Sequence, residues 1–224
     1  MVKIKALESQ HPSILRRRSP GLDVQPPLGQ RESMSDNLVL EISEACKNAH
    51  TAVMAEGGVL PPRLFVLRAG QLLGYVALRP VYVGRDAAEG IATMSYLAAA
   101  AEADEVIGVW ETQDLAVACD HVPLHPGPGL NLLHASAKDQ VLYRYPYREW
   151  RLPGQTRDGL AKAKPQWLTE SSAVANPSLE PAIEAMVGMC WQPFEVESTD
   201  MVNAAAAYLT ELGYTVELTT AAAS

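Results

Sequence analysis

The expected architecture follows from the stretch 64-LFVLRAGQLLGYVALRPVYV-83, which contains two apolar runs on either side of a short turn sequence. The turn, Ala69-Gly70-Gln71, has the length and the glycine of a hairpin connection. We therefore expect two neighbouring antiparallel strands here. They form the first pair of a sheet to which the rest of the chain adds.

Three further strands are expected in the middle of the chain. The segment 105-EVIGVWE-111 has a continuous apolar centre, which indicates a central strand buried on both faces. The segments 130-LNLLHAS-136 and 140-QVLYRYPYREW-150 form a second hairpin with its turn at residues 137–139. Proline has no amide to donate, so Pro146 places the later half of the last strand at an edge or outside the sheet.

Helices are expected before, between and after these strands. Apolar residues recur at spacings of three and four in the helix that starts near Met34, and Gly57 ends it. A second helix covers 86–103, and Thr112 caps a short third one. The last expected elements are helices at about 178–191 and 199–212 and an edge strand at 214–218.

These elements predict a mixed α/β fold of the α+β type. Its centre is one mostly antiparallel, five-stranded sheet covered by helices, and a helical extension follows at the C-terminus. The element order resembles that of profilin-like and roadblock-like modules, which implies helices on the faces of the sheet and carries no family motif. The expected parts are a disordered or extended leader with prolines and arginines, a core domain, a linker, and C-terminal helices with an edge strand that pack on the core, at residues 1–33, 34–151, 152–178 and 179–224.

Composition limits the class of protein. Of the 224 residues, 48% are hydrophobic, which is enough for a core, and the apolar runs are too short to cross a bilayer. The net charge of −8 opposes non-specific binding to nucleic acid. Three widely spaced cysteines are typical of reduced thiols, so we expect a cytoplasmic protein. Abundant alanine, with 12 arginines against 6 lysines, indicates a high-GC coding bias and a bacterial or phage source.

One stretch, 119-CDHVPLHPGPGLNLLHASAKD-139, gathers three of the five histidines of the chain. Its candidate zinc ligands are His121, His125, His134 and Asp139. They predict, as one alternative, a zinc-dependent hydrolase with Glu111 as general base. We favour a surface loop without metal, because the strand and turn assignments leave only His121 and His125 in the loop.

Part of this stretch resembles the signature of JAMM-type metalloproteases. His125-Pro126 followed by 136-SAKD-139 matches the later histidine and the Ser-x-x-Asp of that signature. The resemblance implies His125 and Asp139 as zinc ligands and Ser136 as the residue that supports the oxyanion. Pro123 stands where the signature has another histidine, so one of its defining ligands is missing.

The segment 143-YRYPYREWR-151 interleaves aromatic and basic residues. The candidate contact residues in it are Tyr143, Arg144, Tyr145, Tyr147, Arg148 and Trp150. In one arrangement the tyrosines pack on one face of the sheet and the arginines are solvated on the other. The same residue types form protein-binding edges and surfaces for single-stranded nucleic acid. The acidic balance of the chain favours a protein partner over nucleic acid.

The expected function is a non-enzymatic module for protein–protein interaction or assembly, of bacterial or phage type. It binds other chains, itself included, through residues 143–151 and needs no cofactor. The sequence contains no Gly-x-Ser-x-Gly elbow and no phosphate-binding loop. The zinc hydrolase is the alternative, binding of single-stranded nucleic acid is a minor one, and no membrane partner is expected.

Overall fold

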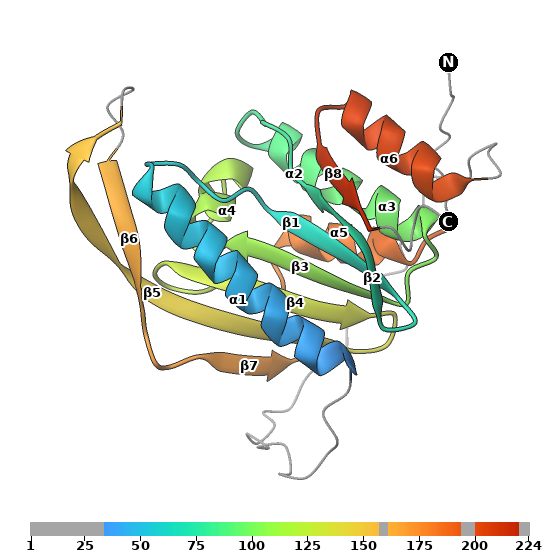
Figure 1. Ribbon diagram of the computed structural model, residues 1–224, viewed down its shortest axis with the longest axis horizontal. Helices are drawn as coiled ribbons and strands as arrows, with labels where there is room; N and C mark the ends of the chain where they lie inside the picture. Colours follow the sequence, from blue (N-terminus) through green and yellow to red (C-terminus); the bar gives the residue numbers. More distant parts are fainter. Residues whose placement is uncertain (1–33, 157–160, 194–199, 220–224) are drawn as a thin grey trace, which may run out of the picture.

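The computed structural model describes residues 34–156, 161–193 and 200–219 and shows three layers (Figure 1). A sheet lies in the middle, α1 (Met34–Ala55) covers one face, and the remaining helices pack on the other face. These are α2 (Arg85–Thr93), α3 (Ser95–Ala100), α4 (Thr112–Cys119), α5 (Pro181–Cys190) and α6 (Met201–Glu211). The expected leader at 1–33 lies outside the described residues.

The sheet confirms the mixed α/β class, with every strand pair antiparallel. Its strands are β1 (Arg63–Arg68), β2 (Gln71–Ala77), β3 (Glu105–Glu111), β4 (Gly129–Ser136), β5 (Gln140–Gln155), β6 (Ala161–Trp167), β7 (Ser172–Ala175) and β8 (Thr215–Leu218). The order is β6-β5-β4-β3-β1-β2-β8, and β7 pairs with β5 beside this path. The expectation of five strands was too low, because the described residues alone form a sheet of eight.

The hairpin of β1 and β2 has the turn that its sequence predicts. Ala69 and Gly70 both have positive φ, of 51° and 72°, as the two central residues of a type I′ hairpin turn require. The amide of Ala69 donates to Asp104 Oδ2 at 2.8 Å, which anchors the turn to the start of β3. This conformation favours glycine at position 70.

Strand β3 occupies the centre, between β1 and β4, as its apolar run predicts. Val106 and Trp110 face the core under α2–α6, whereas Ile107 and Val109 face the core under α1. Side chains of a strand alternate between the two faces, so a strand covered on both sides is apolar throughout. The two hydrophobic cores therefore meet at this strand.

Two helix predictions need correction. The helix expected over 86–103 is broken at Met94 into α2 and α3. The cap of α4 is Glu111, whose Oε2 accepts the amide of Asp114 at 2.7 Å. Thr112 cannot serve as the cap, because its hydroxyl donates to the carbonyl of Gly129 at 2.9 Å.

The C-terminal elements pack on the core. Helices α5 and α6 contribute Ile183 and Leu209 to the core that also holds α2 and α3. Strand β8 pairs with β2, and a Cβ on Gly74 would collide with the carbonyl of Glu217 there. None of the helices in the described segments is both long and apolar enough to span a membrane.

The segment 152–178, expected as a linker, contains the end of β5 together with β6 and β7. Strand β6 has the sequence AKAKPQW, in which lysine and proline replace the apolar residues of an interior strand. Lysine and proline are typical of sheet edges, where one side of the strand has no neighbour. This segment was assigned as a linker because it has no apolar periodicity. Its composition is nevertheless that of an edge strand.

Candidate functional site

The two halves of β5 have different surroundings. Residues Gln140–Pro146 pair with β4, and β7 lies along the other side of Val141–Arg144. From Tyr147 onward the strand pairs with β6 alone. We call the two-stranded part, residues 147–155 with 161–167, the arm; it extends past the end of β4 at one end of the sheet (Figure 1).

The base of the arm packs against the C-terminal half of α1. Tyr147 is buried beside Met54 and Ala163. The His50 ring lies 5.1 Å from the Tyr147 ring and 5.9 Å from the Trp167 ring, between centroids. Burial lowers the pKa of His50 to about 4, and neither ring nitrogen has a hydrogen-bond partner among the described residues. The aromatic cluster therefore holds a neutral histidine.

The opposite face of the arm is exposed. Strand pairing places Trp150 opposite Lys164 and Arg148 opposite Gln166, and directly paired residues share a face. Trp150 is 65% exposed. These four residues, which we call the outer face, include two cations and no carboxylate. An exposed indole between cations is thus displayed at one end of the molecule.

The predicted contact residues of β5 are divided between these environments. Arg148 and Trp150 are exposed on the outer face. Tyr143 and Tyr145 pack against the core under α1, and the Lys47 ammonium lies 5.1 Å from the centroid of Tyr145. Tyr147 is buried in the arm base.

Arg144 has a different role. Its Nη2 donates to the carbonyls of Pro126 and Gly127 at 2.8 and 3.1 Å. The guanidinium therefore fastens the proline- and glycine-rich loop between α4 and β4 to the middle of β5. Both halves of the predicted segment carry arginines, but only this one is half-buried and bound to backbone.

The predicted metal ligands do not form a cluster. His134 lies on β4 and its Nε2 is 2.6 Å from Glu105 Oε2, while Asp139 is exposed in the turn between β4 and β5. His121 and His125 lie in the loop after α4. Within 34–156, 161–193 and 200–219, no group of three or more His, Cys, Asp or Glu side chains is arranged to hold a metal ion. Zinc stays a prediction without a ligand set in these segments.

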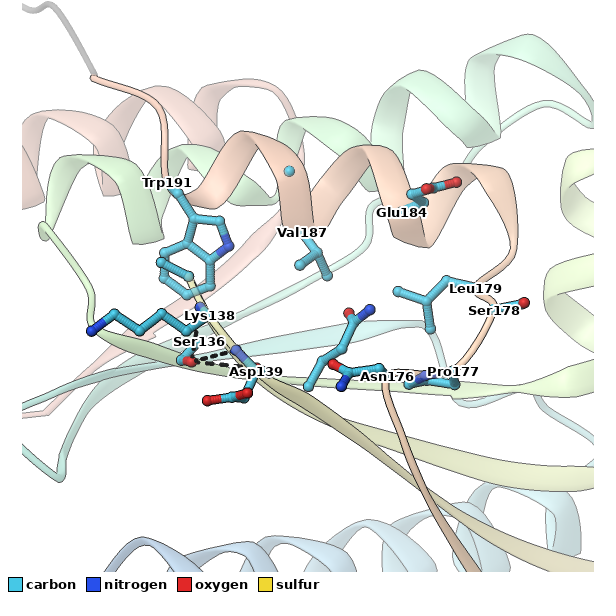
Figure 2. A pocket seen from close by; sticks show the side chains of 13 residues that line it. Ser136, Lys138, Asp139, Asn176, Pro177, Ser178, Leu179, Glu184, Val187 and Trp191 are labelled. Atoms are coloured by element: carbon cyan, nitrogen blue, oxygen red, sulfur yellow. Dashed lines mark hydrogen bonds between the residues drawn. The ribbon is translucent and has the colours of Figure 1, made fainter. Parts of the chain in front are cut away.

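A hollow of about 670 Å³ lies between the β4–β5 turn, the segment after β7, and α5. Trp191 and Val187 point from the α5 side toward the turn, and Asn176 lies below them (Figure 2). Ser136 Oγ accepts the amides of Lys138 and Asp139 at 3.2 and 3.1 Å, so this serine stabilises the turn. None of the residues lining the hollow is a histidine, which separates Asp139 from the other predicted ligands.

A second, apolar depression, the α4 groove, lies between α4 and the segments before β1 and after β2. It consists of two adjoining hollows of about 190 and 300 Å³ that share Val59, Val81, Asp114 and Ala118. Val83 and Val117 extend it at the surface and are 67% and 70% exposed. Exposed valines around a concave surface are typical of an interaction site.

Two carboxylates line the α4 groove, and Asp114 lies where its two hollows adjoin. Glu111 is buried, and its Oε1 accepts the amide of Gly129 at 2.9 Å. Burial, together with the charges of Glu111 and Glu149, raises the pKa of Asp114 to about 6. Strand pairing places Glu111 opposite Leu130 and Leu130 opposite Tyr145, two residues before the arm, so the groove and the arm lie at the same end of the molecule.

Comparisons with protein-family models, with curated proteins and with solved structures find no match for this chain. The similarity to profilin-like and roadblock-like modules thus stays one of element order.

The sequence did not predict the α4 groove or the part of β6 in the outer face. Lys164 and Gln166 reach the outer face only through pairing with β5. The groove is assembled from three separate segments of the chain. The one available signal was the pair of proline-flanked apolar segments, 59-VLPP-62 and 78-LRPVYV-83, whose valines are more apolar than connections require.

Proposed function

We propose that this protein is a non-enzymatic module for protein–protein interaction or assembly, and that it contacts its partner through the outer face of the arm. The observation that carries the proposal is the exposure of Trp150, at 65%, between Arg148 and Lys164. Tryptophan and arginine are the residue types most enriched at interface hot spots. Burial of the indole by a partner is a substantial source of binding energy.

The backbone of the arm supports the same proposal. Beyond Pro146 no described strand pairs with β5 on the side where β4 ends, and β6 is the last strand at this end of the sheet. Free strand edges are surfaces to which another chain can add by backbone hydrogen bonds. Only the base of the arm packs on α1. The remainder is a two-stranded ribbon, which is marginally stable in water and gains stability when another chain pairs with it.

Binding of single-stranded nucleic acid fits the arm less well. Such surfaces stack successive bases on several aromatic side chains. The outer face offers Trp150 alone, because Tyr143 and Tyr145 pack on the α1 side and Tyr147 is buried. The net charge of −8 also opposes a polyanion. A cytoplasmic location is part of the proposal and is supported by three cysteines without disulfides.

Photo-crosslinking from the arm tests this function. A photoreactive phenylalanine analogue replaces Gln166 in the full chain, and the same analogue at Leu40, 56% exposed on α1, is the matched control. In an extract of the source organism we expect protein adducts from position 166 and few from position 40. Trp150→Ala should remove the adducts. Adducts that disappear with nuclease, or no adducts at position 166, would contradict the proposal.

A further inference from the structure

We infer that the partner of the arm is a second copy of this chain, and that Trp150 of each copy inserts into the α4 groove of the other. This inference rests on the proposed function of the arm and specifies its partner. The indole that supplies the contact and the groove that receives it are both present on every copy.

The shapes are complementary. The outer face carries one large projecting apolar side chain, and the two adjoining hollows of the groove measure about 190 and 300 Å³. A water molecule occupies about 30 Å³ in the liquid, so each hollow has room for roughly six waters or more. This is enough space for an indole ring, which would displace that water. Val59 and Val117, 56% and 70% exposed, would be covered by the inserted ring.

The charges are complementary as well. Arg148 and Lys164 flank the indole, and the outer face carries no carboxylate. The groove contains Glu111 and Asp114, and the only cation among its lining residues is Arg79, whose guanidinium is paired with Asp86. Glu111 is buried and accepts two backbone amides, so the carboxylate that the cations of the arm approach is Asp114, which is half-buried and lines both hollows. This pairing offsets part of the repulsion between two chains of net charge −8.

The positions of the two features favour a closed pair. The arm and the groove lie at the same end of the molecule, because Glu111 of the groove pairs through Leu130 with Tyr145, just before the arm begins. A two-fold axis at this end brings each arm to the groove of the other copy, which produces two identical contacts and no further growth. Trp150 is mostly exposed within its own chain, so it does not fill its own groove.

Sedimentation velocity on the purified full chain tests the inference with two variants. Trp150→Ala removes the inserted side chain, and Val117→Glu places a charge at the exposed rim of the groove. We expect a dimer for the wild type and a dissociation constant about 30-fold or more higher for each variant alone. Leu40→Glu, at a comparably exposed site on α1, is the matched control and should remain dimeric.

A mixture of the two variants gives the sharpest result. The Val117→Glu chain retains its arm and the Trp150→Ala chain retains its groove, so a mixed dimer keeps one of the two contacts intact. We expect dimers in the equimolar mixture at concentrations where each variant alone is monomeric. No recovery on mixing would overturn the reciprocal insertion.

The outcomes separate this inference from the proposed function. If Trp150→Ala dissociates the dimer and Val117→Glu does not, the groove assignment is wrong and the arm remains the contact surface. A wild-type chain that stays monomeric to about 100 µM, while position 166 crosslinks to a different protein, overturns the second copy as partner and supports the function. A monomer without protein crosslinks overturns both.

Discussion

The two halves of β5 have similar sequences but differ in burial and in the strands that neighbour them. Aromatic and basic residues alternate throughout 143–151, yet Tyr143 and Arg144 are half-buried whereas Trp150 and Arg151 are exposed. The first half lies between β4 and β7, and the second has β6 alone. Neighbouring strands and helices therefore determine burial here, and the alternation within the strand does not.

Pro146 lies where the two halves meet. It is the last β5 residue that pairs with β4, opposite Gly129, and its carbonyl accepts the amide of Leu168 at 2.9 Å. Because proline has no amide, the ladder loses a donor at this position. The sequence predicts that the later half of this strand lies at an edge or leaves the sheet. The arm is consistent with this prediction, because beyond Pro146 β5 pairs with β6 alone.

The largest expected effect comes from the half that is paired on both sides. Leu142 is 2% exposed and belongs to the core under α2–α6. Leu142→Ala should lower the free energy of unfolding by about 2–5 kcal/mol, because the cavity is surrounded by packed strands. Urea denaturation followed by circular dichroism measures it. Arg148→Ala, in the arm, is the control and should change stability by less than about 0.5 kcal/mol.

A smaller effect should distinguish the two arginines. Arg144→Met removes charge-assisted hydrogen bonds to the carbonyls of Pro126 and Gly127, at a cost of about 1–3 kcal/mol. Arg148→Met, on the exposed outer face, removes no such bond and serves as the matched control. Equal stabilities of the two variants in urea denaturation would show that the loop does not depend on this guanidinium.

Sequence patterns predicted the parts of the fold that apolar residues mark. The hairpin of β1 and β2, the buried β3 and the hairpin of β4 and β5 follow directly from apolar runs and turn residues. Strands β6 and β7 could not be recognised from the sequence. The β6 sequence AKAKPQW and the β7 sequence SAVA are equally typical of a loop. They are strands because β5 offers them a free edge, which is a tertiary condition.

The candidate site was partly predictable for the same reason. Arg148 and Trp150 belong to a segment whose composition indicates a contact surface, and the structure exposes both. The same composition also predicted Tyr147 as a contact residue, whereas the structure buries it against α1. The α4 groove depends on residues from three distant segments, and no local pattern brings these together.

Acid should weaken the base of the arm through His50. In the unfolded chain a histidine has a pKa of about 6.5, whereas burial lowers the pKa of His50 to about 4. Between these values the unfolded state binds a proton that the folded state does not, so the free energy of unfolding falls as pH falls from about 6.5 to about 4. Above this window the contribution is constant.

His50→Leu should remove this dependence. Both ring nitrogens are buried and lack partners among the described residues, so leucine loses no hydrogen bond seen there. The quantity compared is the free energy of unfolding of the variant minus that of the wild type. We expect this difference to be larger at pH 5 than at pH 7.5 by roughly 1–2 kcal/mol. Asp114, whose raised pKa acts with the opposite sign, is present in both proteins and largely cancels in the difference. Parallel pH profiles for the two proteins would contradict the neutral His50.

The smallest expected effect on stability is that of Trp150→Ala, only eight residues along the same strand from Leu142. The indole is 65% exposed, so its removal should change the free energy of unfolding of the dissociated chain by less than about 0.5 kcal/mol. Urea denaturation is therefore measured at concentrations where the chain is monomeric, since association would add to apparent stability. A loss above about 1 kcal/mol under these conditions would mean that Trp150 packs within its own chain. Its position on the arm would then be explained by its contribution to the stability of the fold and not by contact with a partner.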